Sequence, residues 1–444
     1  MAPLRLFHLL TVLRGGSGFA AIVQTGVATV LVLGINVVTG IVSARVLGAQ
    51  GRGELSALLL CPQFLSFLFT LGLPASTIIR IKGSPANAAG LMGAALALSV
   101  AMGLSAAVTG FVILPLLLKQ YDAHLLSIAR LLLAFVMLGV TSTVLVAALQ
   151  ISDRFRAYNG VRFWQSALIL FSLVGLAAAH RFTPETGAFA YVLPTLPFFL
   201  WNLWWAIREF RPRLSNWRAN CLTLLSYGWR VHILDIGNTL FLQLDKIILV
   251  AVLAPSVFGL YVVVFNLSRL VTTFANAATP VLLPRTAGKS AEEVLTLTSR
   301  AVTATTVLTF AAVVSFTVLG SFVLRWVYGA QFAAGYWILV ILAFEGALAS
   351  SASVLQQPYL ALHRPGTVAA FQALSLTFGA ACIYVLARRF AAEGAAYGLL
   401  LATSLRFTLT YCGFGWLLRL RAPRLLPTRG ELTALLDRPR MRPA

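Results

Sequence analysis

The stretch ARVLGAQGRGELSALLL, residues Ala44 to Leu60, lies between two long apolar segments and decides how the chain folds. Its three glycines, Gly48, Gly51 and Gly53, occur where one hydrophobic segment ends and the next begins. Glycine permits the backbone conformations of a chain reversal and allows two helices to approach closely. The stretch therefore predicts a turn between two membrane-length helices.

A fainter copy of this stretch, VAVLAPSVFGLYVVVFN, occurs at Val250 to Asn266, an offset of about 206 residues. Both prolines that recur at this offset are expected to kink their helices. A repeat this long in an apolar chain indicates two related bundles, and six spans between the copies place the pseudo-twofold axis normal to the membrane. The recurring residues are Ile41, Val46, Leu47, Gly53 and Pro74, which fall on Ile247, Val252, Leu253, Gly259 and Pro280.

The composition identifies a membrane protein. Of the 444 residues, 59% are hydrophobic and only 11% are charged, and the mean hydropathy is +0.87. A soluble protein of this size carries about 25% charged residues. Apolar segments of about 20 residues, long enough to cross a bilayer, recur about twelve times. We predict an all-α polytopic membrane protein with about twelve transmembrane helices.

The most hydrophilic segment within the apolar region, RPRLSNWRAN at residues 211–220, is a candidate linker between two halves. It predicts an N-terminal six-helix lobe at 1–210 and a C-terminal six-helix lobe at 211–420. The remaining residues, 421–444, form a basic, proline-interrupted tail.

The net charge of +21 reflects membrane topology. With the N-terminus in the cytoplasm, about 21 of the 34 Lys and Arg residues fall on the inner side, as the positive-inside rule requires. An even number of spans then places both termini in the cytoplasm. The excess basic charge is explained by this topology and by attraction to anionic membrane lipids, so nucleic acid is not an expected partner. The N-terminal segment has basic residues but no small-residue cleavage site before an apolar run of span length, so we expect a short cytoplasmic segment and not a cleaved signal peptide.

Polar and charged side chains within the spans are candidates for a binding site. A polar stripe on a membrane helix must face protein or water, although hydrogen bonding between helices explains such a stripe equally well. Arginine side chains that face a cavity are expected to attract phosphate or carboxylate groups. The substrate-binding candidates are Arg269, Arg80, Arg230, Asn36, Gln63, Asn266 and Asn276.

Three carboxylates within the spans, Asp235, Asp245 and Glu345, are candidates for ion coupling. Asp245 stands next to Lys246 and pairs with it locally in the alternative interpretation. Glu345 is the one acidic residue of its span, ILAFEGALASS. It is a candidate proton site, or alternatively a neutral, hydrogen-bonded structural residue.

Motifs of soluble enzymes are not found. The run LPRTAGKS, Leu283 to Ser290, ends like a phosphate-binding loop but has Leu283 in place of the first glycine and follows no strand. The four cysteines and five histidines show no metal-binding spacing. We therefore expect no catalytic residues, no metal and no cofactor.

Three segments resemble one known family. ARVLGAQGRGEL followed by LGLPAST (Leu71 to Thr77), LDKIILVAVLAPSVFGLYVVVFNLSRL (Leu244 to Leu270) and ATPVLLPR (Ala278 to Arg285) are similar to oligosaccharide flippases of the Wzx type. These are polysaccharide-export proteins of the multidrug/oligosaccharidyl-lipid/polysaccharide superfamily. The resemblance implies two six-helix lobes around a central cavity lined by spans one, two, seven and eight.

The resemblance also implies a function. It is the movement, by alternating access, of undecaprenyl-pyrophosphate-linked oligosaccharide from the cytoplasmic to the periplasmic leaflet of the bacterial inner membrane. Other polysaccharide-assembly membrane proteins are the implied partners, and Arg269, Arg80 and Arg230 best fit the cationic lumen of such proteins. The alternatives are a drug/cation antiporter of the same fold and a membrane glycan polymerase or ligase. A polymerase needs a sizeable external loop, which this chain lacks.

Overall fold

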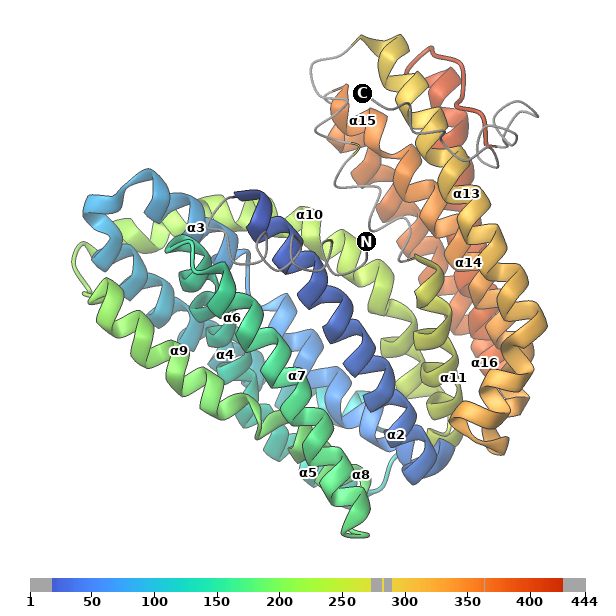
Figure 1. Ribbon diagram of the computed structural model, residues 1–444, viewed down its shortest axis with the longest axis horizontal. Coiled ribbons are helices and arrows are strands. Elements are labelled where there is room, and N and C mark those ends of the chain that lie inside the picture. The colour runs from blue at the N-terminus through green and yellow to red at the C-terminus, as the bar shows by residue number, and fades with distance from the viewer. Residues whose placement is uncertain (1–17, 273–281, 283–289, 363, 426–444) are drawn as a thin grey trace, which may run out of the picture. The chain divides into compact units, whose positions relative to one another are not determined.

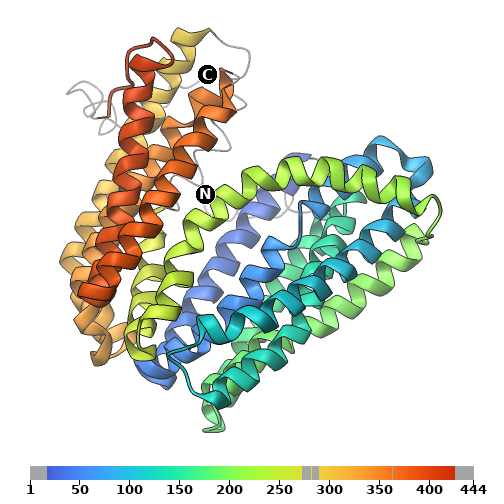
Figure 2. The ribbon, with the colours of Figure 1, turned by 180° about the vertical axis from the view of Figure 1, so that it is seen from behind.

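The structure, a computed structural model, describes residues 18–272, 282, 290–362 and 364–425. Within these residues every regular element is a helix and no strand is present, so the predicted all-α fold is confirmed. Figures 1 and 2 show the helices from opposite sides. In chain order the α-helices are α2 (Gly18–Leu68), α3 (Leu73–Gly83), α4 (Ala88–Leu117), α5 (Ala123–Leu132), α6 (Val136–Ile151), α7 (Phe155–Ala178), α8 (Pro184–Val192), α9 (Thr195–Phe210), α10 (Trp217–Val252), α11 (Pro255–Ser268), α13 (Ala291–Phe322), α14 (Tyr336–Leu355), α15 (Gln357–Ala361) and α16 (Pro365–Trp416).

Short turns of other helical types join or extend several of these helices. They are η1 (Pro85–Asn87), η2 (Leu133–Phe135), η3 (Arg269–Thr272), η4 (Val323–Tyr328) and η5 (Ala330–Gly335).

The number of membrane-length helices agrees with the prediction of about twelve spans. Nine helical segments of the described chain are long and apolar enough to cross a membrane. Two of them contain a pair of helices, because α2 is interrupted at Gly48 and α16 at Phe390 and Ala391. Helix α10, with 36 residues, is a further long helix outside the nine.

The described chain divides into two compact units. Unit 1 consists of Met1–Ile236 and Ala254–Gly259, and unit 2 consists of Gly237–Leu253 and Leu260–Ala444. The boundaries fall inside α10 and α11, so each of these helices contributes residues to both units. The predicted lobe limits at 1–210 and 211–420 stay predictions. Most of the predicted tail, from residue 426 onward, lies outside the described residues.

The glycine-rich stretch forms the predicted turn. Gly48 adopts φ 70° and ψ −174°, a conformation that favours glycine, and the two parts of α2 meet there. Figure 1 shows the blue ribbon of α2 turning back at this place. The second predicted break also occurs, since α2 ends at Leu68 and Pro74 lies in the first turn of α3. Its repeat counterpart, Pro280, lies outside the described residues.

The two copies of the repeat contact each other within unit 1. A Cβ atom at Gly53 would overlap the carbonyl oxygen of Pro255, and one at Gly259 would overlap the carbonyl oxygen of Ala49. Ala49 and Pro255 are equivalent in the repeat, as are Gly53 and Gly259, so the contact is reciprocal, as at a twofold axis. Glycine at both positions allows this backbone approach, which confirms the close approach predicted for Gly53 and extends it to Gly259.

Unit 1 has its core where α3, α4, α6 and α9 meet. Met92 and Ala95 of α4 pack against Leu145 of α6, and all three are fully buried. A Cβ atom at Gly103 of α4 would contact the backbone of Met137 in α6. Small residues therefore bring these helices close together, as is common in membrane bundles.

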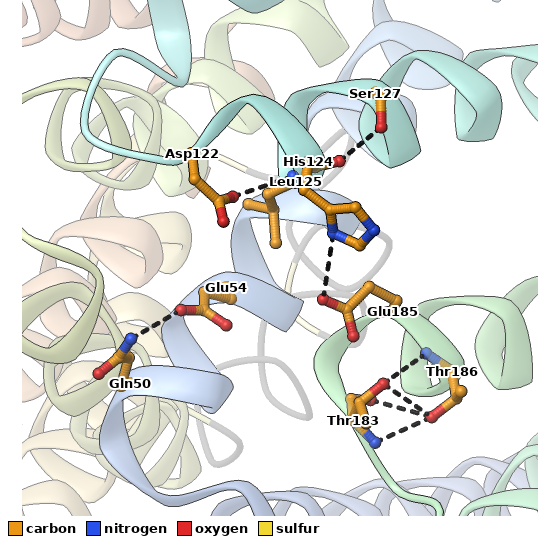
Figure 3. A network of polar contacts seen from close by, with 9 residues as sticks. All are labelled: Gln50, Glu54, Asp122, His124, Leu125, Ser127, Thr183, Glu185 and Thr186. Atoms are coloured by element: carbon orange, nitrogen blue, oxygen red, sulfur yellow. Dashed lines mark hydrogen bonds and ion pairs between the residues drawn. The ribbon is translucent and has the colours of Figure 1, made fainter.

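Polar side chains fix the helix ends at one end of unit 1 (Figure 3). Asp122 Oδ1 caps α5 by accepting a hydrogen bond of 3.0 Å from the Leu125 backbone N–H. Thr183 and Thr186 form a capping box at the start of α8. His124 Nδ1 lies 4.0 Å from Glu185 Oε1 and so connects α5 to α8. The two caps satisfy backbone N–H groups that a helix start leaves without partners.

Unit 2 is built around α14, which packs against α13 on one side and α16 on the other. The two halves of α16 pack on each other, since a Cβ atom at Gly379 would touch Ala402. Tyr359 Oη donates a 2.7 Å hydrogen bond to the Thr410 carbonyl, and its ring lies 5.2 Å from that of Phe414. This packing fixes α16 against the helices that carry the charged residues described next.

Candidate functional site

Unit 2 contains a cluster of five charged side chains from α10, η3, α14 and α16, which we call the charged cluster. Its two carboxylates, Asp245 and Glu345, are each only 1% exposed. The other members are Lys246, Arg269 and Arg406, so that three cations stand beside two anions. Charged groups within membrane helices are costly and usually serve a function. The cluster is therefore the strongest candidate site in the described part of the chain.

One end of the charged cluster is centred on Asp245. Tyr261 Oη donates a 2.8 Å hydrogen bond to Asp245 Oδ2, and Lys246 Nζ lies 3.9 Å from Oδ1. Lys246 Nζ also donates a 3.1 Å hydrogen bond to Gln243 Oε1. The ammonium group lies 3.8 Å from the centre of the Phe265 ring, where the face of the ring attracts it. The local pairing of Asp245 with Lys246 is thus one of several contacts.

The other end of the charged cluster is centred on Glu345. Arg269 Nη2 donates to Glu345 Oε2, and Thr403 Oγ1 donates a 2.6 Å hydrogen bond to Oε1. The Arg269 guanidinium lies 4.3 Å from the centre of the Phe265 ring. Phe265 therefore contacts the cations of both ends, Lys246 and Arg269.

The local sequence explains how these groups meet. Tyr261, Phe265 and Arg269 are spaced by four residues, which places them on one face of α11 and of η3 directly after it. Thr403 and Arg406 are three residues apart on α16 and are neighbours on its surface. The four-residue spacing of Tyr261, Phe265 and Arg269 is visible in the sequence, but it is equally typical of a buried helix face and does not by itself predict the site.

The structure brings together three of the predicted site residues, Arg269, Asp245 and Glu345. Glu345, which stands alone in its span, is the ion-pair partner of Arg269. Asn266 of α11 is exposed. Asn276 and the side chain of Asp235 lie outside the described residues.

The remaining predicted residues lie in unit 1. Arg80 of α3 is half-buried, with its guanidinium 5.3 Å from the centre of the Tyr227 ring. Its Nε is buried without a hydrogen-bond partner. Arg230 of α10 and Asn36 of α2 are exposed, and Gln63 lines a cavity inside unit 1. None of these four is part of the charged cluster.

The chemistry open to the charged cluster is proton transfer at its two carboxylates. In the described residues no set of three His, Cys, Asp or Glu side chains is arranged to hold a metal ion. Two carboxylates that each contact a cation and a hydroxyl donor are suited to gaining or losing a proton together with a change of partner.

The hydrogen bond from Tyr261 to Asp245 gives a first prediction. Tyr261→Phe removes the donor and leaves Asp245 Oδ2 buried, so we expect the free energy of unfolding to fall by about 1–3 kcal/mol. Thermal unfolding of the purified full chain in detergent measures this change. Tyr411→Phe is the matched control, since Tyr411 is half-buried and its ring stacks on Phe407. Equal unfolding temperatures for the two variants would contradict the hydrogen bond.

The chain belongs to a known family. Residues 20–288 match the model of the family described as "Polysaccharide biosynthesis protein". This match confirms the predicted membership in a family of polysaccharide biosynthesis proteins. No curated protein matches the chain in a comparison of sequences.

Several solved structures share the fold. The structure described as "Lipid II flippase MurJ, inward closed conformation" is 12% identical, with a TM-score of 0.73, over 88% of this chain and 87% of that one. An inward-facing multidrug resistance MATE family transporter is 15% identical, with a TM-score of 0.66, over 89% and 97%. A superfamily transporter from Pyrococcus furiosus is 16% identical, with a TM-score of 0.58, over 89% and 94%. The predicted two-lobe transporter fold is thereby confirmed, and the chain is a multi-pass membrane protein.

Proposed function

We propose that this protein moves undecaprenyl-pyrophosphate-linked oligosaccharide from the cytoplasmic to the periplasmic leaflet of the bacterial inner membrane by alternating access. The observation that carries the proposal is the family match over residues 20–288, which ties the chain to polysaccharide biosynthesis. The fold likeness to a structure named as a lipid II flippase supports the same class of cargo. Both termini lie in the cytoplasm in this proposal.

The pyrophosphate of such a substrate needs cationic side chains that are not already paired with a carboxylate of the protein. Arg269 is engaged by Glu345, so it is not a ready ligand in this conformation. Arg80 and Arg230 have no carboxylate partner among the described residues, and the Nε of Arg80 makes no hydrogen bond. A guanidinium group matches the oxygen spacing of phosphate. Arg80 and Arg230 are therefore the proposed ligands of the pyrophosphate.

The charged cluster is the proposed site of ion coupling. A proton that binds Glu345 weakens its attraction to Arg269 and leaves the guanidinium available to an anionic group. Loss of that proton restores the ion pair. The two states differ in the partner of Arg269, and this difference gives a coupled ion a means of shifting a conformational equilibrium.

Depletion of the protein in living cells, followed by rescue with Arg80 variants, tests the proposed function. Depletion should leave lipid-linked glycan on the cytoplasmic leaflet. Arg80→Ala should restore export about tenfold less well than the natural protein, because a charge-assisted contact to phosphate is lost. The amount of glycan exported and the amount of lipid-linked precursor are the measurements.

Two control variants accompany Arg80→Ala. Arg80→Lys keeps the positive charge that orients α3 and so separates an effect on topology from an effect on binding. Arg156→Ala removes an exposed arginine of α7 and should export normally. Normal export by Arg80→Ala would refute Arg80 as a ligand, and normal export after depletion would refute the proposed function.

A drug/cation antiporter is the second candidate, favoured by the fold likeness to a multidrug transporter over 97% of that chain. Such a protein needs a carboxylate that is free to receive a cationic drug. Here Glu345 accepts from Arg269, and Asp245 lies beside Lys246. Efflux of a cationic dye by the purified protein in vesicles would favour this candidate over the flippase.

A further inference from the structure

Unit 1 contains a cavity of about 670 Å³ that the charged cluster does not touch. It lies beside the break between α2 and α3 and is also lined by residues of α6, α7, α8 and α10. A volume of this size is typical of sites for small molecules. All of its lining residues belong to unit 1.

The break between α2 and α3 gives the cavity a non-helical wall. Leu71 and Gly72 adopt left-handed conformations, with φ 44° and 68°. A Cβ atom at Gly72 would overlap the carbonyl oxygen of Gly228 in α10, so glycine is required for this close packing. Irregular backbone at membrane depth occurs where it is buried in protein or lines a cavity. Interrupted helices of this kind often mark binding sites in transporters.

The polar side chains that line the cavity are amides, hydroxyls and the imidazole of His232. Among the described lining residues there is no Asp, Glu, Lys or Arg. Gln63 and Gln165 line the cavity, and neither amide forms a hydrogen bond with another described residue. Ser142, Thr143 and Thr195 contribute hydroxyl groups. The amides can donate to and accept from an uncharged ligand, whereas the Thr143 and Thr195 hydroxyls donate to the carbonyl oxygens of Val140 and Val192 and offer the ligand acceptors only.

One lining residue, His232, is held in a defined orientation. It is 2% exposed, and its Nε2 lies 2.9 Å from the carbonyl oxygen of Leu68 at the end of α2. Because a carbonyl oxygen only accepts hydrogen bonds, Nε2 of a neutral imidazole must carry the proton here, and Nδ1 is then an acceptor. The Phe67 ring, 5.4 Å from the His232 ring, supports this position.

We propose that this cavity binds uncharged sugar residues of the lipid-linked glycan, while the pyrophosphate is bound elsewhere by arginine. This proposal rests on the proposed function and specifies its substrate class. Sugar hydroxyls satisfy amide and hydroxyl partners in both directions. Tyr191 and Phe135 add aromatic surface for the apolar faces of the sugar rings.

Two other occupants fit this cavity less well. A polyprenyl chain offers no hydrogen-bonding partner to the exposed amide of Gln63 or the half-buried amide of Gln165, whereas sugar hydroxyls do. An acidic sugar brings a carboxylate into a cavity with no lining Lys or Arg among the described residues, and an uncompensated buried charge is costly.

Native mass spectrometry of the purified full chain tests the proposal with three lipids. These are undecaprenyl pyrophosphate carrying a neutral trisaccharide, the same lipid with a terminal uronic acid, and undecaprenyl pyrophosphate without sugar. Gln165→Leu should weaken binding of the neutral-glycan lipid by about fivefold, the cost of one or two lost hydrogen bonds. Binding of the sugar-free lipid should stay within about twofold. The natural protein should bind the uronic-acid lipid at least about tenfold less tightly than the neutral one.

Matched variants make each outcome decisive. Gln120→Leu makes the same chemical change in an exposed loop and should bind all three lipids normally. Thr143→Val removes a lining hydroxyl at nearly constant volume and provides a second cavity variant if Gln165→Leu does not fold.

Several results would overturn the proposal. An equal loss for the neutral-glycan lipid and the sugar-free lipid would place the lipid tail or the pyrophosphate in the cavity. No loss for either cavity variant would show that the cavity is unoccupied, and equal affinity for neutral and acidic glycans would refute its selectivity. If the natural protein binds no lipid-linked glycan, the proposed function fails as well.

Discussion

Replacing Gly53 by valine is expected to prevent stable folding of the protein. The new Cβ atom would overlap the carbonyl oxygen of Pro255 and would lie 3.0 Å from the backbone nitrogen of Gly259. Because backbone atoms stand opposite, no side-chain rotation relieves the overlap, and the two segments must separate. We expect a loss of about 3 kcal/mol or more, at the upper end for overpacked sites. The yield of monodisperse protein in detergent and its unfolding temperature are the measurements.

Gly40→Val is the matched control for Gly53→Val. Gly40 lies on the same helix, α2, and a Cβ atom there meets nothing within 4 Å. Gly259→Val should behave like Gly53→Val, because the repeat makes the contact reciprocal and a Cβ atom at Gly259 would overlap the Ala49 carbonyl. Equal yields of Gly53→Val and Gly40→Val would show that the copies do not meet as described.

The positions of helices and breaks could be predicted because they depend on local sequence. Apolar length indicates a membrane helix, and the glycines and prolines near Gly48 and Pro74 indicate where helices are interrupted. The offset of about 206 residues identified Gly53 and Gly259 as equivalent. The offset alone does not show that equivalent residues touch, because an internal repeat is compatible with many arrangements of its copies.

The partners of the charged residues could not be predicted in the same way. Arg269 and Glu345 are both conspicuous in the sequence, but 76 residues separate them. Which helices are neighbours depends on packing, and packing depends on side chains from the whole unit. Tyr261 was overlooked because a tyrosine in an apolar helix is usually part of the core. The neutral cavity of unit 1 was overlooked, apart from Gln63, because Ser, Thr and Gln in membrane helices usually bond to neighbouring helices.

The ion pair between Arg269 and Glu345 gives the last prediction, a double-mutant cycle. Arg269→Leu removes the cation that donates a hydrogen bond to Glu345, which is 1% exposed and then has only Arg406 nearby, and Glu345→Leu leaves Arg269 beside Lys246 and Arg406. Each single variant should lose about 3–5 kcal/mol of stability. The double variant removes both charges of the pair and should lose less than the sum of the single variants, with a remaining loss because the buried Arg406 no longer has Glu345 nearby. Unfolding temperatures of the four proteins measure the coupling, and Arg156→Leu, at an exposed site outside the proposed binding residues, is the control.

Export by the same variants separates a structural ion pair from a coupling site. A double variant that folds and exports glycan normally would show that the pair only stabilises unit 2. A double variant that folds but does not export would assign function to the pair. Glu345→Gln then tests the coupling itself, because the amide oxygen still accepts from Thr403 but the side chain cannot gain or lose a proton. The rate at which lipid-linked glycan is moved across the membrane of vesicles should respond to an imposed proton gradient in the natural protein and not in Glu345→Gln. An equal response in both would exclude Glu345 as the coupling site.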